Sequence, residues 1–387
     1  MSFSFAANLL ALLFSFFVIG AVLGAAFSQS ARERLAKLLH LEHLLLTKSF
    51  HNPILRPGRH PWSAEAVFNP AAAVLAERTH LIYRAIGTDG VSRLGYASSP
   101  DGFVFDKRLP YPAYVARNPR HMAMHMRRYA PVSYPSGGSW GGCEDPRMVV
   151  IDGRVYVTFN MFDGWDYIRV AVLSIAKEDF LAERFSKWDG PYIISKPREV
   201  HKNWVLFPEK IGGRFAILHS IAPTVDIAFR DSIEAIGKDE PFVESWAGSR
   251  RDVPHRKGVW DTIVLGAGPP PIRTEHGWLL FYHALQDSDS GKYKLGAMLL
   301  DLVDPTKVLY RAAAPVLAPD EHYENHGKPG IVYACGAVVR DGTLFVYYGG
   351  ADKVVCVATT PLNGFVDALI RGSQPELEAI LPAQTAH

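Results

Sequence analysis

The sequence predicts an all-β fold, and two observations support this prediction. Short runs rich in β-branched and aromatic residues recur from residue 60 onward, and turn-forming dipeptides separate them. The runs fall into five clusters, near residues 66–107, 145–176, 203–230, 259–302 and 330–360. Each cluster has the size of one blade of a β-propeller, although a sandwich or a barrel also accommodates many short strands.

Turn signals within these clusters mark the expected hairpins. They are dipeptides that contain glycine, which readily adopts the positive φ of a tight turn. They stand at Asp101-Gly102, Asp152-Gly153, Gly212-Gly213, His276-Gly277 and Asp341-Gly342. Residues 106–140 read as a long loop over one face, and helix is expected only at residues 375–383 and in a few connectors.

Composition excludes several classes of protein. Hydrophobic residues make up 48% of the chain and charged residues 21%, which is enough apolar material for a large core. The formal net charge of +2 gives no case for nucleic-acid binding. Cys143, Cys335 and Cys356 form no CxxC pair, so neither a metal site nor a disulfide framework is expected.

The N-terminal stretch, residues 5–27, is apolar, carries no charge and is long enough to cross a bilayer as a helix. Arg32, Arg34 and Lys37 follow it, and the positive-inside rule then places the rest of the chain in the cytoplasm. The alternative is a signal peptide cleaved near Ala25, which implies a secreted or periplasmic protein. Residues 31–48 show leucines at helical spacing and read as an amphipathic juxtamembrane helix.

These patterns divide the chain into four parts. We expect a transmembrane anchor or signal segment at residues 1–30 and an amphipathic helix and linker at 31–59. The β domain follows at residues 60–370, and a C-terminal tail occupies 371–387.

Asp145 is the first candidate for a catalytic group. Pro146 biases the preceding residue toward an extended backbone, and the glycines at 141 and 142 allow a ligand to approach the chain closely. Arg147 offers a guanidinium that holds a carboxylate or an anionic oxygen. A charged turn that leads into a hairpin is the structural alternative for this tetrapeptide.

Further motifs give the chain a family resemblance. It resembles glycoside hydrolase family 130, the β-mannoside phosphorylases and β-mannosidases built on a five-bladed β-propeller. The resemblance covers about residues 65–362 in the order of the family. It rests on "FNPAA" at Phe68, "LIYRA" at Leu81, "EDPR" at Glu144, "LFPEKI" at Leu206, "GAGPPPI" at Gly266, "GWLLFYHA" at Gly277, "KLGAMLLDLVDP" at Lys294 and "YYGGAD" at Tyr347.

The resemblance implies roles for individual residues. Asp145 matches the general acid that protonates the leaving oxygen, in some members through a sugar hydroxyl. Asn69 and Arg84 match positions that hold the sugar of the −1 subsite, and Asp352 matches a further sugar-binding carboxylate. The other candidates for substrate contact are Arg147, Asp261 and His283, and for His283 a structural role is the alternative.

The choice between water and phosphate as nucleophile depends on cations. Of three basic positions expected for phosphate in the resemblance, Lys202 is retained, while Ser220 and Val264 stand at the other two. The sequence therefore favours an inverting β-mannosidase. The first alternative is a phosphorylase that releases α-mannose 1-phosphate, with Lys202 and Arg169 holding the co-substrate phosphate.

An inverting hydrolase needs a second carboxylate as base, about 6.5–9.5 Å from the acid. The candidates, none of which the sequence singles out, are Glu209, Glu244, Asp252 and Asp261. A second alternative is an inert propeller that binds glycans. The expected partners are an oligosaccharide and, through the N-terminal helix, a membrane; no metal and no cofactor are expected.

Overall fold

The computed structural model describes residues 44–116, 128–131, 133–134, 136–163, 168–245 and 259–372. The apolar stretch at residues 5–27 and the expected helix at 375–383 lie outside these ranges. Within them, no helix is long and apolar enough to cross a membrane.

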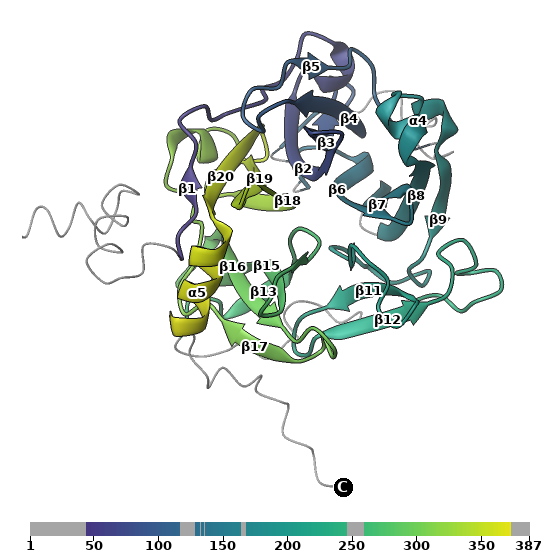
Figure 1. Ribbon diagram of the computed structural model, residues 1–387. Helices are drawn as coiled ribbons and strands as arrows, with labels where there is room; N and C mark the ends of the chain where they lie inside the picture. The colour runs from purple at the N-terminus through teal and green to yellow at the C-terminus, as the bar shows by residue number, and fades with distance from the viewer. Residues whose placement is uncertain are drawn as a thin grey trace, which may run out of the picture.

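The strands pair into four sheets, the largest of which spans two blades, and the resulting five groups are arranged as a ring, which is the architecture of a five-bladed propeller (Figure 1). The predicted all-β fold is confirmed, and each of the five predicted clusters corresponds to one blade. Blade 1 holds β2 (Ala66–Leu75), β3 (Arg78–Ile86), β4 (Val91–Ser99) and β5 (Lys107–Arg108). Blade 2 holds β6 (Gly141–Ile151), β7 (Arg154–Asp163), β8 (Ile168–Ala176) and β9 (Asp189–Ile193).

The remaining three blades follow in chain order. Blade 3 holds β10 (Val205–Leu206), β11 (Phe215–Ser220) and β12 (Asp226–Arg230). Blade 4 holds β13 (Ile263–Ala267), β14 (Ile272–Arg273), β15 (Trp278–Gln286), β16 (Asp289–Leu300) and β17 (Val308–Arg311). Blade 5 holds β18 (Val332–Arg340), β19 (Thr343–Gly350) and β20 (Val354–Pro361).

Antiparallel hairpins build each blade, and their turns match the sequence signals. Asp152-Gly153 joins β6 to β7, and Asp341-Gly342 joins β18 to β19. All four residues have positive φ, between 47° and 74°. Such two-residue turns follow the natural twist of a hairpin, which explains why Asp-Gly is favoured there.

The ring closes through the start of the described chain. Strand β1 (Thr47–Lys48) pairs antiparallel with β20, with Thr47 opposite Thr359 and Lys48 opposite Ala358. The expectation of a helix or linker over residues 31–59 is therefore wrong for residues 44–59, which belong to the propeller. Residues 31–43 lie outside the described part of the chain.

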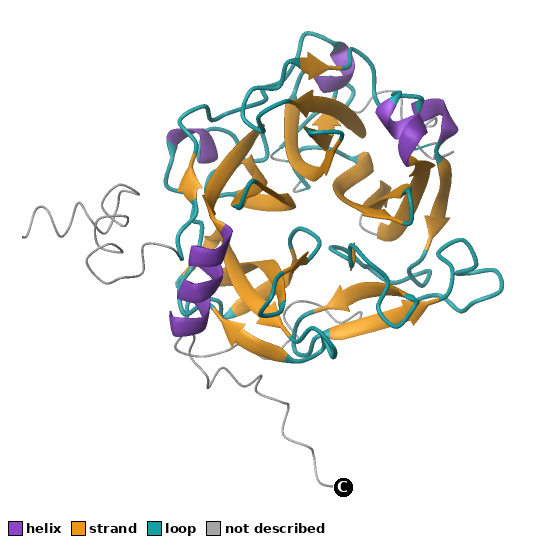
Figure 2. Ribbon diagram, in the orientation of Figure 1, coloured by secondary structure: helices purple, strands orange, loops and turns teal. Residues whose placement is uncertain are grey.

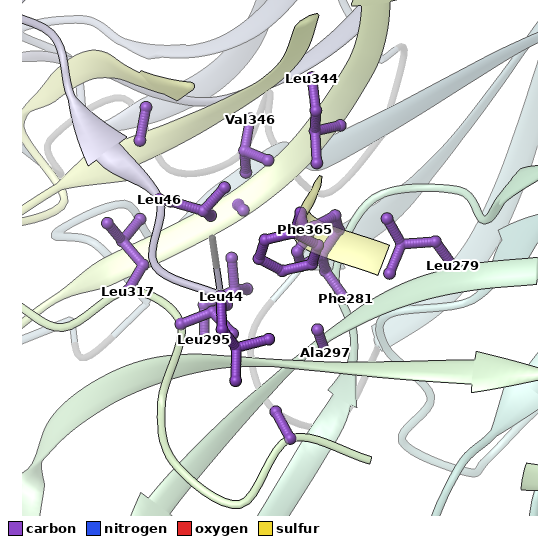
Figure 3. Packing of buried hydrophobic residues seen from close by; sticks show 14 of the residues in the cluster. Leu44, Leu46, Leu279, Phe281, Leu295, Ala297, Leu317, Leu344, Val346 and Phe365 are labelled. Atoms are coloured by element: carbon purple, nitrogen blue, oxygen red, sulfur yellow. The ribbon is translucent and has the colours of Figure 1, made fainter. Parts of the chain in front are cut away.

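The leucine run at residues 44–46 explains this difference. Leu44 and Leu46 are buried, Leu45 between them is less so, and this alternation is that of a strand. Both side chains enter a core cluster with Leu295 and Phe365 (Figure 3). A short leucine run fits the helical period as well as it fits a strand, so the pattern alone does not distinguish them.

Helices lie at the periphery of the ring (Figure 2). Helix α4 (Lys177–Leu181) follows β8, and α5 (Leu362–Gly372) follows β20. Helix α5 buries Phe365, Val366 and Leu369 against blades 4 and 5, where Phe281 and Phe365 have ring centroids 5.8 Å apart. The expected tail at 371–387 therefore begins within the end of this helix.

A buried ion-pair cluster fastens β1 to blade 5. The Lys48 ammonium, 4% exposed, donates to the carboxylate of Asp320, to Glu324 Oε2 at 2.5 Å and to the Ala318 carbonyl at 2.8 Å. The Tyr348 hydroxyl donates to the other Glu324 oxygen at 2.8 Å. Burial raises the pKa of Glu324, and Lys48 counters part of that rise.

We expect Lys48→Met to destabilise the protein. The variant keeps an apolar side chain of similar length but leaves two carboxylates without their cation, and breaking a buried ion pair costs about 3–5 kcal/mol. Urea unfolding measures the change. The control is Lys107→Met, which removes a more exposed ion pair with Glu183 and should cost less than about 1 kcal/mol. Equal losses for the two variants would contradict the role assigned to Lys48.

Candidate active site

Four residues in a left-handed conformation mark the candidate site. They lie in strand breaks and connections of four blades, and all are Asn or Asp, which tolerate positive φ better than most other residues. Each such conformation costs about 1–3 kcal/mol, and such residues gather at functional sites. The four are Asn69 (φ 48°), Asp145 (φ 50°), Asn203 (φ 66°) and Asp352 (φ 52°).

The backbone around Asp145 is shaped by an irregularity in β6. The pairing of β6 with β7 shifts register between Glu144 and Arg147, and β2 shifts in the same way between Phe68 and Ala71. A bulge re-aims the side chains beside it. Asn69 and Asp145 occupy these two bulges, and their side chains meet across neighbouring blades.

Asp145 is held by a donor from each of two strands of blade 1. Asn69 Nδ2 donates to Asp145 Oδ1 at 2.8 Å, and Arg84 Nη1 donates to the same oxygen at 3.1 Å. Burial raises the pKa of this carboxyl, but the charges of Arg84 and Lys202 outweigh burial and hold the pKa below its ordinary value. Asp145 is therefore a carboxylate in the ligand-free site.

Arg84 connects Asp145 to a second carboxylate, that of Glu144. The guanidinium is 2% exposed and donates from Nη2 to Glu144 Oε1 at 2.9 Å. Its Nε donates to Ser92 Oγ at 2.9 Å, and its carbon lies 4.7 Å from the centre of the Phe68 ring. These contacts fix the plane of the guanidinium between the two acids.

Lys202 reaches the same cluster from the connection that leads into blade 3. Its Nζ donates to Glu144 Oε2 at 3.0 Å and lies 5.4 Å from the centre of the Phe162 ring. Ser136 Oγ donates to Glu144 as well, at 2.8 and 2.9 Å. Glu144 is fully buried and thus bridges two cations. Sequence reasoning did not select it, although it stands beside Asp145 in the "EDPR" motif.

Asp352, in the turn between β19 and β20, faces this cluster from blade 5. Burial raises its pKa, and the charges of Asp145 and Glu144 add to the rise. Lys328 Nζ lies 3.8 Å from its carboxylate and acts in the opposite direction. The structure thus brings together the expected residues Asn69, Arg84, Asp145, Lys202 and Asp352.

Arg147, expected to contact substrate, instead links the blades from within. The guanidinium is 2% exposed and donates to the Asp145 carbonyl at 2.8 Å, to Asn203 Oδ1 at 3.1 Å and to the Gly268 carbonyl at 3.0 Å. These partners belong to blade 2, the connection before blade 3, and blade 4. Arg147 therefore supports the backbone of Asp145 from behind.

His283 and Arg169 also occupy supporting positions. His283 Nε2 accepts the Ala334 N–H at 3.0 Å, and its ring stacks on Tyr333 with centroids 3.8 Å apart. The Tyr333 hydroxyl donates to Asn203 at 2.7 Å. Arg169 Nε donates to Ser195 Oγ at 3.2 Å, and its guanidinium also donates to the Ser195 carbonyl.

The carboxylates considered as hydrolytic bases do not join Asp145. Asp261, also expected to contact substrate, is fully buried in blade 4, where Arg311 Nη2 lies 2.6 Å away and the Tyr282 hydroxyl donates at 2.6 Å. This carboxylate is neutralised by its arginine, so both expectations for it are corrected. Glu209 forms an exposed ion pair with Arg273, and Glu244 forms one with Lys196. Asp252 lies outside the described residues.

No cluster of three or more His, Cys, Asp or Glu side chains in the described ranges has the arrangement of a metal site. The cysteines are buried thiols, and burial raises the pKa of Cys335, which faces Arg147 and Asp145, to about 12. This thiol is thus uncharged at neutral pH. The charges of the site, within the described ranges, come from its carboxylates, its arginines, Lys202 and Lys328.

Gly349 keeps Asn69 in place. A Cβ at this position would lie 2.1 Å from Asn69 Oδ1, whereas a Cβ at the neighbouring Gly350 would meet nothing closer than 3.2 Å. We expect Gly349→Ala to displace Asn69 from Asp145 and lower the catalytic rate of the site about 100-fold, the cost typical of a 1 Å misplacement in a catalytic site.

The control for this prediction is Gly350→Ala, which should keep most of the activity. Steady-state kinetics of the two variants, with circular dichroism to verify folding, make the comparison. Similar activity of the two folded variants would contradict the positioning role of Asn69.

Comparisons with known proteins show the family of the chain. The family model described as beta-1,4-mannooligosaccharide phosphorylase matches residues 48–371. A 1,2-beta-oligomannan phosphorylase from Thermoanaerobacter sp. (strain X514) is 36% identical over 317 residues, which cover 79% of this chain and 94% of that protein. A beta-1,2-mannobiose phosphorylase from the same strain is 32% identical over 328 residues, covering 81% and 96%.

Solved structures share the fold. A putative glycosidase from Bacteroides thetaiotaomicron has a TM-score of 0.63 at 24% identity, covering 82% of this chain and 96% of that one. The beta-1,2-mannobiose phosphorylase from Listeria innocua, in complex with beta-1,2-mannobiose, has a TM-score of 0.61 at 22% identity, covering 84% and 99%. With the family model spanning nearly the whole described chain, the protein belongs to glycoside hydrolase family 130 and is a glycoside-processing enzyme.

Proposed function

We propose that the protein is a β-mannoside phosphorylase, in which inorganic phosphate is the nucleophile and α-mannose 1-phosphate is the product. The sequence favoured hydrolysis, with phosphorolysis as the alternative. The relatives that are 36% and 32% identical are both phosphorylases, and they favour the alternative.

The observation that carries the proposal is the pair of cations around Glu144 and Asp145. Arg84 and Lys202 enter one buried cluster from different blades, and both lie close enough to Asp145 to lower its pKa. Phosphate requires such cations, whereas activation of water requires a base. The acids proposed as that base, where the structure describes them, are paired elsewhere.

The absence of basic side chains at two positions was the argument for hydrolysis. Ser220 donates its hydroxyl to the Ala222 carbonyl at 3.1 Å, and Val264 is an apolar residue that packs against the core of blades 3 and 4. Neither offers a charge to phosphate. Arg84, which was assigned only to the sugar, supplies a second cation near Lys202 and weakens that argument.

The proposed reaction uses these groups in a single displacement. A phosphate oxygen attacks the anomeric carbon from the face opposite the leaving group, the glycosidic C–O bond breaks, and the leaving oxygen takes a proton from Asp145. Inversion converts the β-linkage into the α-phosphate ester. Because phosphate is already an anion, no base has to remove a proton from the nucleophile.

The substrate class proposed is a β-1,2-linked oligomannoside. The two relatives described above, at 36% and 32% identity, are named for β-1,2 linkages, although the family model carries a β-1,4 description. Incubation of the enzyme with β-1,2- and β-1,4-mannobiose separates the two possibilities.

For the location of the enzyme, the apolar stretch at residues 5–27 and the basic residues after it support a membrane anchor with the propeller in the cytoplasm. A phosphorylated sugar made there is retained by the cell. A reporter fused to the C-terminus tests this location, and a reporter active only outside the cytoplasm would overturn it.

We expect activity to depend on phosphate. The enzyme should convert β-mannobiose to mannose and mannose 1-phosphate only when phosphate is present, and Asp145→Asn should abolish this activity while the protein stays folded. Chromatography of the products with and without phosphate gives the measurement. Release of free mannose alone, at a rate independent of phosphate, would instead establish the hydrolase.

We expect Lys202→Met to raise the KM for phosphate at least tenfold, because one charged hydrogen bond to the nucleophile is lost. The matched control is Lys210→Met. Lys210 also pairs with a carboxylate, Asp152 at 2.9 Å, and lies over an aromatic ring, that of Phe215, at 4.9 Å. The control should leave the KM unchanged, and an unchanged KM in Lys202→Met would exclude Lys202 as a phosphate ligand.

A further inference from the structure

The charges in the candidate site nearly balance before any ligand binds. Among the described residues, four cations, Arg84, Arg147, Lys202 and the more exposed Lys328, face three carboxylates, those of Glu144, Asp145 and Asp352. With every carboxylate ionised, the net charge is one positive unit. The other titratable groups that face the cluster in the described ranges are Tyr129, Cys335 and Tyr333. Burial raises the pKa of Tyr129 and Cys335, so these two stay neutral, and the Tyr333 hydroxyl donates to Asn203.

A phosphate dianion changes this balance. It turns the net charge of the cluster from one positive to one negative unit, in a region where most of the side chains are almost fully buried. Uncompensated charge in such a region is costly, and the usual response is that an acid takes up a proton.

We propose that phosphate binding in this site is coupled to the uptake of one proton from solvent, and that Asp145 is the group that accepts it. This inference rests on the proposed phosphorolysis. It means that the general acid is a carboxylate in the free enzyme and becomes an acid when the nucleophile binds.

The contact between Lys202 and Glu144 supports the coupling. A phosphate oxygen that accepts a hydrogen bond from Lys202 Nζ must approach the Glu144 oxygen that lies 3.0 Å from this nitrogen. Two anions then share one cation, and Lys202 offsets less of the negative charge on Asp145. The affinity of the nearby carboxylates for a proton rises as a result.

Of the two carboxylates that Arg84 bridges, Asp145 is the better acceptor. Glu144 accepts strong bonds on both oxygens, from Arg84 and Ser136 on Oε1 and from Lys202 and Ser136 on Oε2. The bonds that Asn69 and Arg84 make to Asp145 both reach Oδ1. Asp145 Oδ2 can therefore take a proton without loss of these bonds.

The proton balance closes over one turnover. Asp145 takes a proton from solvent as phosphate binds and gives it to the leaving sugar oxygen as the glycosidic bond breaks. Asp145 is then again a carboxylate beside Arg84, and the enzyme returns to its starting charge when the sugar phosphate leaves. A bound sugar without phosphate meets an unprotonated acid, so the site does not cleave it.

Isothermal titration calorimetry tests this coupling. Inorganic phosphate is titrated into the full chain and into Asp145→Asn at pH 7, in buffers of different ionisation enthalpy. We expect the wild type to take up about one proton more than the variant. Phosphate itself gains or loses the same number of protons in both titrations, so its contribution cancels when the two values are subtracted. Asp352→Asn is titrated as well, because Asp352 is the other carboxylate that could accept the proton. The control is Asp152→Asn, which removes a carboxylate outside the cluster, paired with Lys210 at 2.9 Å, and should take up protons as the wild type does.

Sulfate gives a second measurement that needs no folded variant, because its charge stays constant between pH 6 and 8. Asp145 has a lowered pKa in the free site and a raised one beside the anion, so affinity should increase as pH falls between those two values. We expect about a tenfold increase per pH unit, as linkage to one proton requires.

Equal proton uptake in the wild type and Asp145→Asn, or a sulfate affinity that does not change with pH, would overturn the coupling while phosphorolysis stands. Loss of the uptake in Asp352→Asn but not in Asp145→Asn would assign the proton to Asp352 and overturn the role of Asp145. Cleavage of β-mannobiose to mannose without phosphate, with no heat of phosphate binding, would instead overturn the proposed function.

Discussion

The shared guanidinium of Arg84 is the interaction on which the candidate site depends. It donates to Asp145 through one nitrogen and to Glu144 through another, and Glu144 in turn holds Lys202. Each of these charges would be costly to bury alone. Together they form a network in which the position and the ionisation of each group depend on the others, so the acid, the anion site and the sugar contacts form one unit.

The ring of blades brings this unit together. Arg84, Asp145 and Asp352 belong to blades 1, 2 and 5, Lys202 leads into blade 3, and the Arg147 guanidinium spans from blade 2 to blade 4. A small shift of one blade would therefore alter several contacts at once. The buried ion pairs at β1 and the core under α5 keep the ring closed. They thereby help to hold the side chains of the site at their positions relative to one another.

Sequence reasoning predicted the local features and failed on the distant ones. The strand clusters and the Asp-Gly turns depend on neighbouring residues, and the structure confirms both, while the role of Asp145 in "EDPR" as the acid stays a prediction. The sequence did not distinguish Asp261, whose partner Arg311 lies 50 residues away, from an acid free to act as a base. It also missed Glu144 and the strand at Thr47, because their roles depend on Lys202 and β20, which only the fold brings near.

The pairing of β1 with β20 has a consequence for folding. Lys48 finds Asp320 across 272 residues of chain, and its strand partner Ala358 lies still farther along. Closing so long a loop costs entropy, and contacts between distant residues slow folding. During synthesis the first strand must wait until nearly all of the propeller has left the ribosome, so blade 5 is completed last. Until then, its unpaired edge is open to any other chain that offers a strand.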